Sequence, residues 1–278
     1  KKVKRKLLKL CSLGLLGITV CTPVMAQQIN YQANPRTGAL QALTIAGDPQ
    51  GMNWLVATDG SQYSWIKENY GWGLGYFTQI KGNRQDEVHW HVPVEIRQGG
   101  KEIIYFAGDI RILVKRYMRD EDLVEEYIFR NLGNEHISLA DIGIYTPFND
   151  NYPNSQTCIN ARTNTHIWEG DNAAYVNALR MGGYAPHLGL VVTKGAVKSY
   201  EIWERGNDKA NSHTRGIIAL NLPDIQLEPG KEYSISWRLF SHKGIDDFQQ
   251  KVLEKGSVFV SCNKYVFEKG EKACIELA

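Results

Sequence analysis

Short strand-like segments joined by tight turns run through most of the chain, and this pattern constrains the fold more than any other feature. Residues 29–32 and 39–46 flank the sequence Asn-Pro-Arg-Thr-Gly, whose proline and glycine suit a hairpin loop. Apolar residues alternate with more polar ones across residues 88–96, which predicts one strand there. Similar segments follow in residues 102–107, 110–117, 124–129, 137–145, 188–193, 197–203, 216–222 and 233–240. Short antiparallel strands in series predict an all-β fold, a large antiparallel β-sandwich.

One helix is predicted near the C-terminus, in residues 246–255. Asp246 or Asp247 would cap it, and Gly256 would end it. Its position after the last long strand is typical of a helix that closes a domain and links it to the next segment. Its apolar face would consist of Phe248, Val252 and Leu253.

The strand pattern resumes after this helix, in residues 258–263, 265–267 and 272–277. These segments either begin a further small β domain or add strands to the sandwich. Their small number favours the first alternative, and with it a chain that is the N-terminal part of a longer protein. The expected organisation is a signal peptide in residues 1–26, a β-sandwich domain in 27–245, a linker helix in 246–256 and a further β segment in 257–278.

The first residues have the three parts of a secretory signal peptide. A basic start is followed by an apolar run in residues 7–21, and Val24 and Ala26 supply the small residues of a cleavage site. The apolar run is too short for a transmembrane helix. Cys21 could mark a lipoprotein, but residues 18–20 are a poor context for lipidation. We therefore expect cleavage after Ala26 and a secreted or periplasmic bacterial protein without a membrane span.

The remaining chain is slightly acidic. Residues 1–26 hold six of the 32 basic residues and none of the 30 acidic ones, so the rest carries a net charge of −4 with His neutral. No basic run survives, which argues against a nucleic-acid partner. Cys158, Cys262 and Cys274 form an odd and sparse set that predicts unpaired buried thiols. A bridge between Cys262 and Cys274 across a hairpin is the alternative.

Motifs for cofactors and metals are absent from the sequence, so no cofactor is predicted. Residues 71–75 are rich in glycine but lack the spacing of a dinucleotide-binding loop, and no phosphate loop, nucleophile elbow or zincin motif occurs. His89 and His91 would share one face of a strand, but no third ligand lies near them, so no metal site is predicted. Carboxylates are present in the central region, but no spacing among them identifies the acid and base of a glycosidase.

Residues 144–189 combine amide, arginine, imidazole and aromatic side chains in a run without a helical or strand period. Such a mixture suits a sugar, whose hydroxyls need donors and acceptors and whose C–H faces pack on flat apolar rings. The alternative is a long loop in which Asn and Gly only form turns. The candidate substrate-binding residues are Arg162, Asn164, His166, Trp168, Arg180, His187, Asn149 and Asp150, together with Trp72 from the glycine-rich segment.

Four of these candidates fall at alternate positions, at Arg162, Asn164, His166 and Trp168. If residues 161–168 are extended, the four side chains share one face. A guanidinium on that face would bind the carboxylate of an acidic sugar through two hydrogen bonds. The alternative is structural, with Arg162 paired to a nearby carboxylate such as Asp150 or Glu169 and with the indole in the core.

Several runs of the sequence resemble a known family. Residues 144–152, 164–168, 175–183 and 186–189, together with the hairpin at 34–38, are similar to the N-terminal β-sandwich of secreted bacterial six-hairpin glycosidases. The resemblance covers about residues 28–255. It implies a galactose-mutarotase-like supersandwich that precedes an (α/α)6 barrel, and it places the catalytic acids in that barrel.

The resemblance leads to one main hypothesis and two alternatives. In the main hypothesis, the chain is the sandwich portion of a polysaccharide-degrading glycoside hydrolase, where it shapes or lines the sugar cleft without holding the catalytic barrel. Its partners would be an oligo- or polysaccharide and the downstream (α/α)6 domain. The alternatives are a stand-alone carbohydrate-binding module and a mutarotase-like enzyme that uses a His as acid and a Glu as base.

Overall fold

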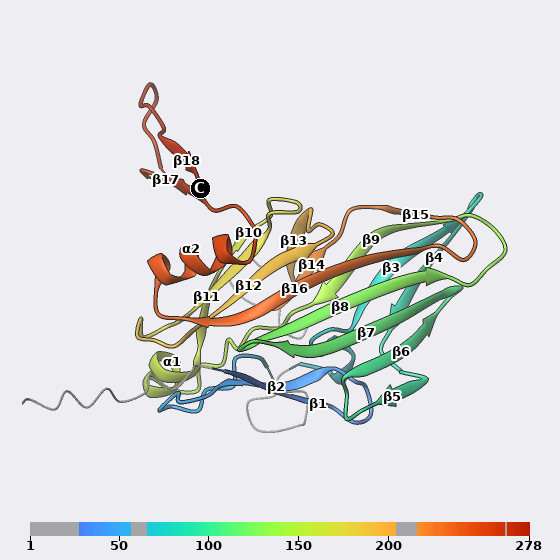
Figure 1. Cartoon of the computed structure of the whole chain (residues 1–278), viewed down its shortest axis with the longest axis horizontal. Helices are drawn as coiled ribbons and strands as arrows, with labels where there is room; N and C mark the ends of the chain where they lie inside the picture. The colour runs from blue at the N-terminus through green and yellow to red at the C-terminus, as the bar shows by residue number, and fades with distance from the viewer. Residues whose placement is uncertain (1–27, 57–65, 204–215, 265) are drawn as a thin grey trace, which may run out of the picture.

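Two antiparallel sheets form the body of the protein in the computed structural model, which describes residues 28–56, 66–203, 216–264 and 266–278 (Figure 1). The first sheet has the strand order β10 (Thr163–Trp168), β11 (Tyr175–Arg180), β12 (His187–Lys194), β16 (Glu232–His242), β8 (Asp122–Asn131), β7 (Ile110–Arg119), β6 (Glu102–Ala107) and β5 (Glu95–Arg97). The second has the order β13 (Ser199–Trp203), β14 (Ile217–Asn221), β9 (Ile137–Tyr145), β3 (Gly75–Lys81) and β4 (Arg84–Trp90), with β15 (Ile225–Leu227) paired to β9. The predicted all-β sandwich is confirmed.

The core lies between the inner faces of these sheets. Trp90 of β4 packs edge-on against Phe129 of β8 across the layers, with ring centroids 5.7 Å apart. On β7 the inward positions alternate with half-buried ones, as a strand with one buried face requires. We call the inner face of the eight-stranded sheet the one turned toward the six-stranded sheet, and the outer face the opposite one. A hairpin of β1 (Ile29–Ala33) and β2 (Leu40–Ile45) adds residues to the same core.

One inward position on β7 holds a charge. Arg116 lies directly across from Glu125 of β8, and both side chains are buried. The Arg116 Nε donates to Glu125 at 2.7 Å, and the indole nitrogens of Trp72 and Trp237 donate to the same carboxylate at 2.8 and 2.9 Å. Both oxygens of the carboxylate therefore accept hydrogen bonds, as a buried ion needs. We call these four residues the buried ion-pair cluster.

The predicted helix is confirmed as α2 (Ile245–Glu254), which packs on the outer face of the eight-stranded sheet (Figure 1). Phe248 lies against Phe240 of β16, with centroids 5.7 Å apart, and against Tyr175 of β11. Two details of the prediction were wrong. The N-cap is Gly244, and Asp247 instead accepts a hydrogen bond from the backbone N–H of Lys243 at 2.8 Å. Leu253 is 37% exposed, whereas Phe248 and Val252 are buried.

Two other expectations about local structure were also wrong. The single strand predicted across residues 88–96 is two strands, β4 and β5, which belong to different sheets. Pro93 lies between them and lacks the N–H that a ladder requires, and Val92 is 70% exposed there. The central run is not without secondary structure, because it contains α1 (Ser155–Ala161), β10 and β11. Asn154 caps α1 by accepting from the Thr157 N–H at 2.9 Å.

After α2, β17 (Val260–Cys262) and β18 (Ile275–Leu277) pair with each other in a hairpin that extends beyond the sandwich (Figure 1). All three cysteines of the described residues are free, and none is buried, contrary to the expectation of buried thiols. Within the described ranges, no helix has the length and apolar character needed to cross a membrane. The predicted signal peptide and its cleavage site lie outside the described residues.

Candidate functional site

A pocket opens at one side of the sandwich, between the terminal strands of the two sheets. β10 ends the eight-stranded sheet and β13 ends the six-stranded sheet, so no further strand of the described residues covers the space between them. The cavity has a volume of about 130 Å³. The side chains and backbone that line it come from Phe148, Asp150, Arg162, Thr163, Asn164, Thr165, Ile167, Met181, Tyr200, Ile202, Gly216 and Ile218.

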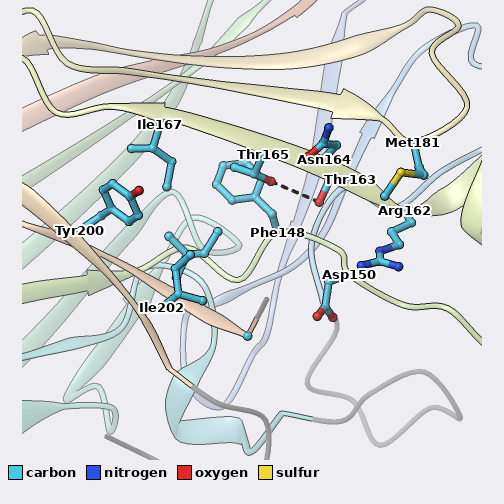
Figure 2. A pocket seen from close by; sticks show the side chains of 12 residues that line it. Phe148, Asp150, Arg162, Thr163, Asn164, Thr165, Ile167, Met181, Tyr200 and Ile202 are labelled. Carbon is cyan, nitrogen blue, oxygen red and sulfur yellow. Dashed lines mark hydrogen bonds between the residues drawn. The ribbon is translucent and has the colours of Figure 1, made fainter. Parts of the chain in front are cut away.

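Strand alternation on β10 supplies the middle of the pocket. Thr163, Thr165 and Ile167 point to the inner face, and the two hydroxyls form a chain (Figure 2). Thr165 donates to the Thr163 oxygen at 3.3 Å, and Thr163 donates to the Asn149 carbonyl at 2.8 Å. The backbone N–H of Thr163 donates to the same carbonyl at 2.7 Å, which fixes the start of the strand. The pocket thus has hydroxyl groups in defined positions.

One end of the pocket is polar, because Arg162 and Asp150 lie there (Figure 2). Arg162 follows α1 as its C-cap residue, and its guanidinium lies over the Tyr152 ring, 5.3 Å from the centroid. Its Nε is buried without a hydrogen-bond partner among the described residues. Among the described residues Arg162 forms no ion pair with Asp150 or Glu169, and its role in binding or in structure stays a prediction. The guanidinium keeps donors for an anionic group.

The opposite end of the pocket is apolar. Ile167 of β10 faces Tyr200 and Ile202 of β13 across the opening (Figure 2). Phe148 forms part of the wall and rests edge-on against Trp72, with centroids 5.0 Å apart. A ligand that is polar at one end, where Arg162 and Asp150 lie, hydroxylated in the middle and apolar on one face would match this arrangement.

Four predicted site residues do not line the pocket. Trp72 is in the core, where its indole donates to Glu125. Asn149 donates to the Asn53 carbonyl at 2.7 Å. Arg180 is buried and pairs with Asp48 at 2.7 Å, between the rings of Trp54 and Tyr184. The Nδ1 of His187 accepts from the Arg180 backbone N–H at 3.0 Å, and burial, followed by the charge of Arg180, lowers the pKa of His187.

The remaining predicted residues are Asp150, Arg162, Asn164, His166 and Trp168. Asp150 and Arg162 line the pocket, and Asn164 borders it from an exposed position on β10 that alternates with the inward-facing Thr163 and Thr165. His166 and Trp168 are exposed on the outer face, away from the pocket. The predicted alternation of Asn164, His166 and Trp168 is therefore present, but Arg162 does not follow it.

Sequence reasoning missed the threonines and the apolar end. Thr163, Thr165 and Ile167 alternate with the predicted residues, so the same strand pattern could have identified them. Tyr200 and Ile202 could not have been found in this way, because only the packing of two sheets brings β13 next to β10.

Metal-binding groups are sparse in the described part of the chain, where no cluster of three or more His, Cys, Asp or Glu side chains could hold an ion. The rings of His89 and His91 have centroids 6.4 Å apart. The Nε2 of His89 lies 3.0 Å from a Glu87 oxygen, so this imidazole already has a polar neighbour on the surface.

No family model matches the chain, and no curated protein matches it. Among solved structures, a polysaccharide lyase is 61% identical, with a TM-score of 0.84, over 91% of this chain and 38% of the lyase chain. A galactose mutarotase related enzyme from Lactobacillus acidophilus is 11% identical over 80% of this chain and 97% of its own, with a TM-score of 0.48. A GH36 alpha-galactosidase from Geobacillus stearothermophilus is 11% identical over 81% of this chain and 41% of its own, with a TM-score of 0.45.

The chain thus spans about two fifths of the length of the lyase that it matches. Its β-sandwich has the fold of part of that lyase, and this match confirms the predicted resemblance to the β-sandwich of a carbohydrate-active protein.

Proposed function

We propose that the chain is the β-sandwich portion of a secreted polysaccharide-degrading enzyme and that its pocket binds an acidic sugar unit. The observation that carries the proposal is Arg162, a partly buried guanidinium that lines the pocket without an ion-pair partner in the described residues. The 61% identity to a polysaccharide lyase supports the polysaccharide context.

The chemistry of the pocket favours a sugar carboxylate. The planar guanidinium presents several N–H donors in a fork that matches the two oxygens of a carboxylate. Thr163 and Thr165 offer hydroxyls to the sugar, and the ring of Tyr200 offers an apolar face to its C–H groups. At about 130 Å³, the cavity is smaller than the several hundred cubic ångströms of a usual ligand pocket. It therefore suits one sugar unit, with the rest of the polymer outside.

The similarity to a lyase changes the expected reaction. A glycoside hydrolase adds water across the glycosidic bond, whereas a lyase breaks its bond by elimination and leaves a carbon–carbon double bond in the product. We propose elimination as the reaction of the complete enzyme, in place of the hydrolysis that the family resemblance implies. The groups that remove and donate protons would lie in a further domain, since the lyase is more than twice as long as the matched region.

A stand-alone carbohydrate-binding module is the second candidate, because the pocket can hold a sugar without any catalytic group. The two candidates differ in the product that the complete reading frame forms from an acidic polysaccharide. An unsaturated product that absorbs in the ultraviolet supports the enzyme. Binding without any such product supports the module.

The site itself is tested by replacing Arg162 with alanine. Because the change removes a charge-assisted hydrogen bond from the pocket, we expect the affinity for an oligogalacturonate to fall by about 1.5–3 kcal/mol. The melting temperature should stay close to that of the parent, since Arg162 forms no ion pair in the described structure. Isothermal titration calorimetry and a thermal melt measure the two quantities.

Arg84→Ala is the matched control, because that arginine is 76% exposed on β4, on the other sheet from β10. It should bind the oligogalacturonate as the parent does. If Arg162→Ala loses stability and the parent binds no acidic glycan, Arg162 is a structural residue and the proposed site is wrong.

A further inference from the structure

The outer face of β10 carries a second group of polar and aromatic side chains, on the side opposite to the pocket. Asn164, His166 and Trp168 alternate along the strand and are all exposed. The register places His166 directly across from Asn177 and Trp168 directly across from Tyr175 on β11. Because Tyr175 packs against α2, these four side chains lie on the face of the sheet that α2 also covers.

The Trp168 indole is exposed but held in place. It is 40% exposed and stacks on Tyr175, with ring centroids 6.4 Å apart and an angle of 24° between the planes. Tyr175 in turn stacks on Phe259, at 5.3 Å and 13°. The backbone of Gly170 also lies against the indole, since a Cβ at that position would come within 2.3 Å of the Trp168 Nε1. A fixed aromatic ring loses little entropy when a ligand stacks on it.

A buried amide lies beside this ring. Asn177 is 6% exposed, and its Oδ1 has no hydrogen-bond partner among the described residues. Its neighbour on the far side is Gly189, which has no side chain and is covered by the ring of Phe240. A buried acceptor without a partner is uncommon in folded proteins and indicates a group that a ligand or a water completes. His166, directly across the ladder, offers an exposed imidazole next to it.

We propose that Trp168, His166 and Asn177 form a second sugar-binding surface, separate from the pocket, which takes a neutral sugar unit. The indole would stack on the C–H face of the ring, and the exposed imidazole of His166, next to Asn177, would bind its hydroxyls. The register pairs Asn164 with Leu179, and neither these two nor the three named residues carry a carboxylate, ammonium or guanidinium group. These five side chains therefore suit a neutral sugar better than an acidic one. This proposal rests on the proposed function, because both require that the chain contacts a polysaccharide.

The test uses the complete chain and two sets of probes, neutral oligosaccharides (cello-, xylo- and galacto-oligosaccharides) and an oligogalacturonate. Trp168→Ala should lower the affinity for the neutral probe by about tenfold relative to the parent. This is the upper range for the loss of one aromatic contact. Trp168→Phe, which keeps an aromatic plate, should retain most of that affinity. Both variants should bind the oligogalacturonate as the parent does. Quenching of tryptophan fluorescence by the neutral probe should be smaller in both variants.

Arg162→Ala separates this proposal from the proposed function, because it should weaken only oligogalacturonate binding. The second surface is refuted if the parent binds none of the neutral probes, or if Trp168→Ala and His166→Ala both bind them as tightly as the parent. In either case, the effect of Arg162→Ala on binding of the acidic probe still tests whether the pocket binds an acidic sugar. If Trp168→Ala fails to fold, Trp168→Phe and His166→Ala decide the outcome, since both replacements keep the strand and its register.

Discussion

Replacing Glu125 with alanine is expected to destabilise the fold by about 3–5 kcal/mol, the cost of leaving one partner of a buried ion pair uncompensated. Arg116 would keep its charge in the core, and the indole N–H groups of Trp72 and Trp237 would lose their acceptor. Urea unfolding of the purified chain, followed by circular dichroism, measures the change in the free energy of unfolding.

The neighbouring residue provides the control. Glu126 lies on the opposite face of β8 and pairs with Lys194 at 3.4 Å near the surface. Because exposed ion pairs contribute little, Glu126→Ala should change the free energy of unfolding by less than about 1 kcal/mol. Equal effects of the two substitutions would contradict the role assigned to the buried ion-pair cluster.

Acidification is expected to weaken the fold through His242. Burial lowers the pKa of His242 to about 4, below its ordinary value near 6.5. The ring packs against Phe248 and His187, and its Nδ1 donates to the Gly244 carbonyl at 3.1 Å. The unfolded chain therefore binds a proton at a higher pH than the folded chain does. Stability from this group is complete above pH 6.5 and decreases by roughly 3 kcal/mol as the pH falls to about 4.

His242→Asn isolates this effect, since an asparagine amide can still donate to Gly244 but does not titrate. Its free energy of unfolding, measured in urea at several pH values, should fall less steeply between pH 6.5 and 4 than that of the parent. His166→Asn, a replacement at an exposed position, should leave the slope of the parent unchanged. Parallel curves for the parent and His242→Asn would show that His242 does not carry the pH dependence.

Local sequence signals predicted those elements that depend on neighbouring residues. The β1–β2 hairpin is an example, because its turn is built from its own side chains and backbone. Asn34 accepts a hydrogen bond from the Arg36 N–H at 2.8 Å, and Gly38 adopts a positive φ of 74°. The helix α2 was predicted for the same reason, since its apolar face and the glycine that follows it are visible within residues 246–256.

Elements that depend on partners distant in the sequence were harder to predict. The alternation across residues 88–96 matched one strand, but Pro93 interrupts the ladder and lets the chain pass from one sheet to the other. Arg162 fell into an alternating series with Asn164, yet it precedes the first residue of β10 and ends α1. The direction of its side chain is therefore not set by the alternation of the strand, and the side chain lines the pocket.

The central claim is that the pocket between β10 and β13 binds an acidic sugar. The most direct measurement is a nuclear magnetic resonance titration of the isotope-labelled chain with an oligogalacturonate. We predict saturable shifts that are largest for the backbone amides of Thr163 and Thr165 and for the Arg162 side-chain Nε–H. A matched neutral oligosaccharide should leave these signals unchanged. The claim would be contradicted if the acidic ligand shifted no signals, or only signals of residues outside the pocket.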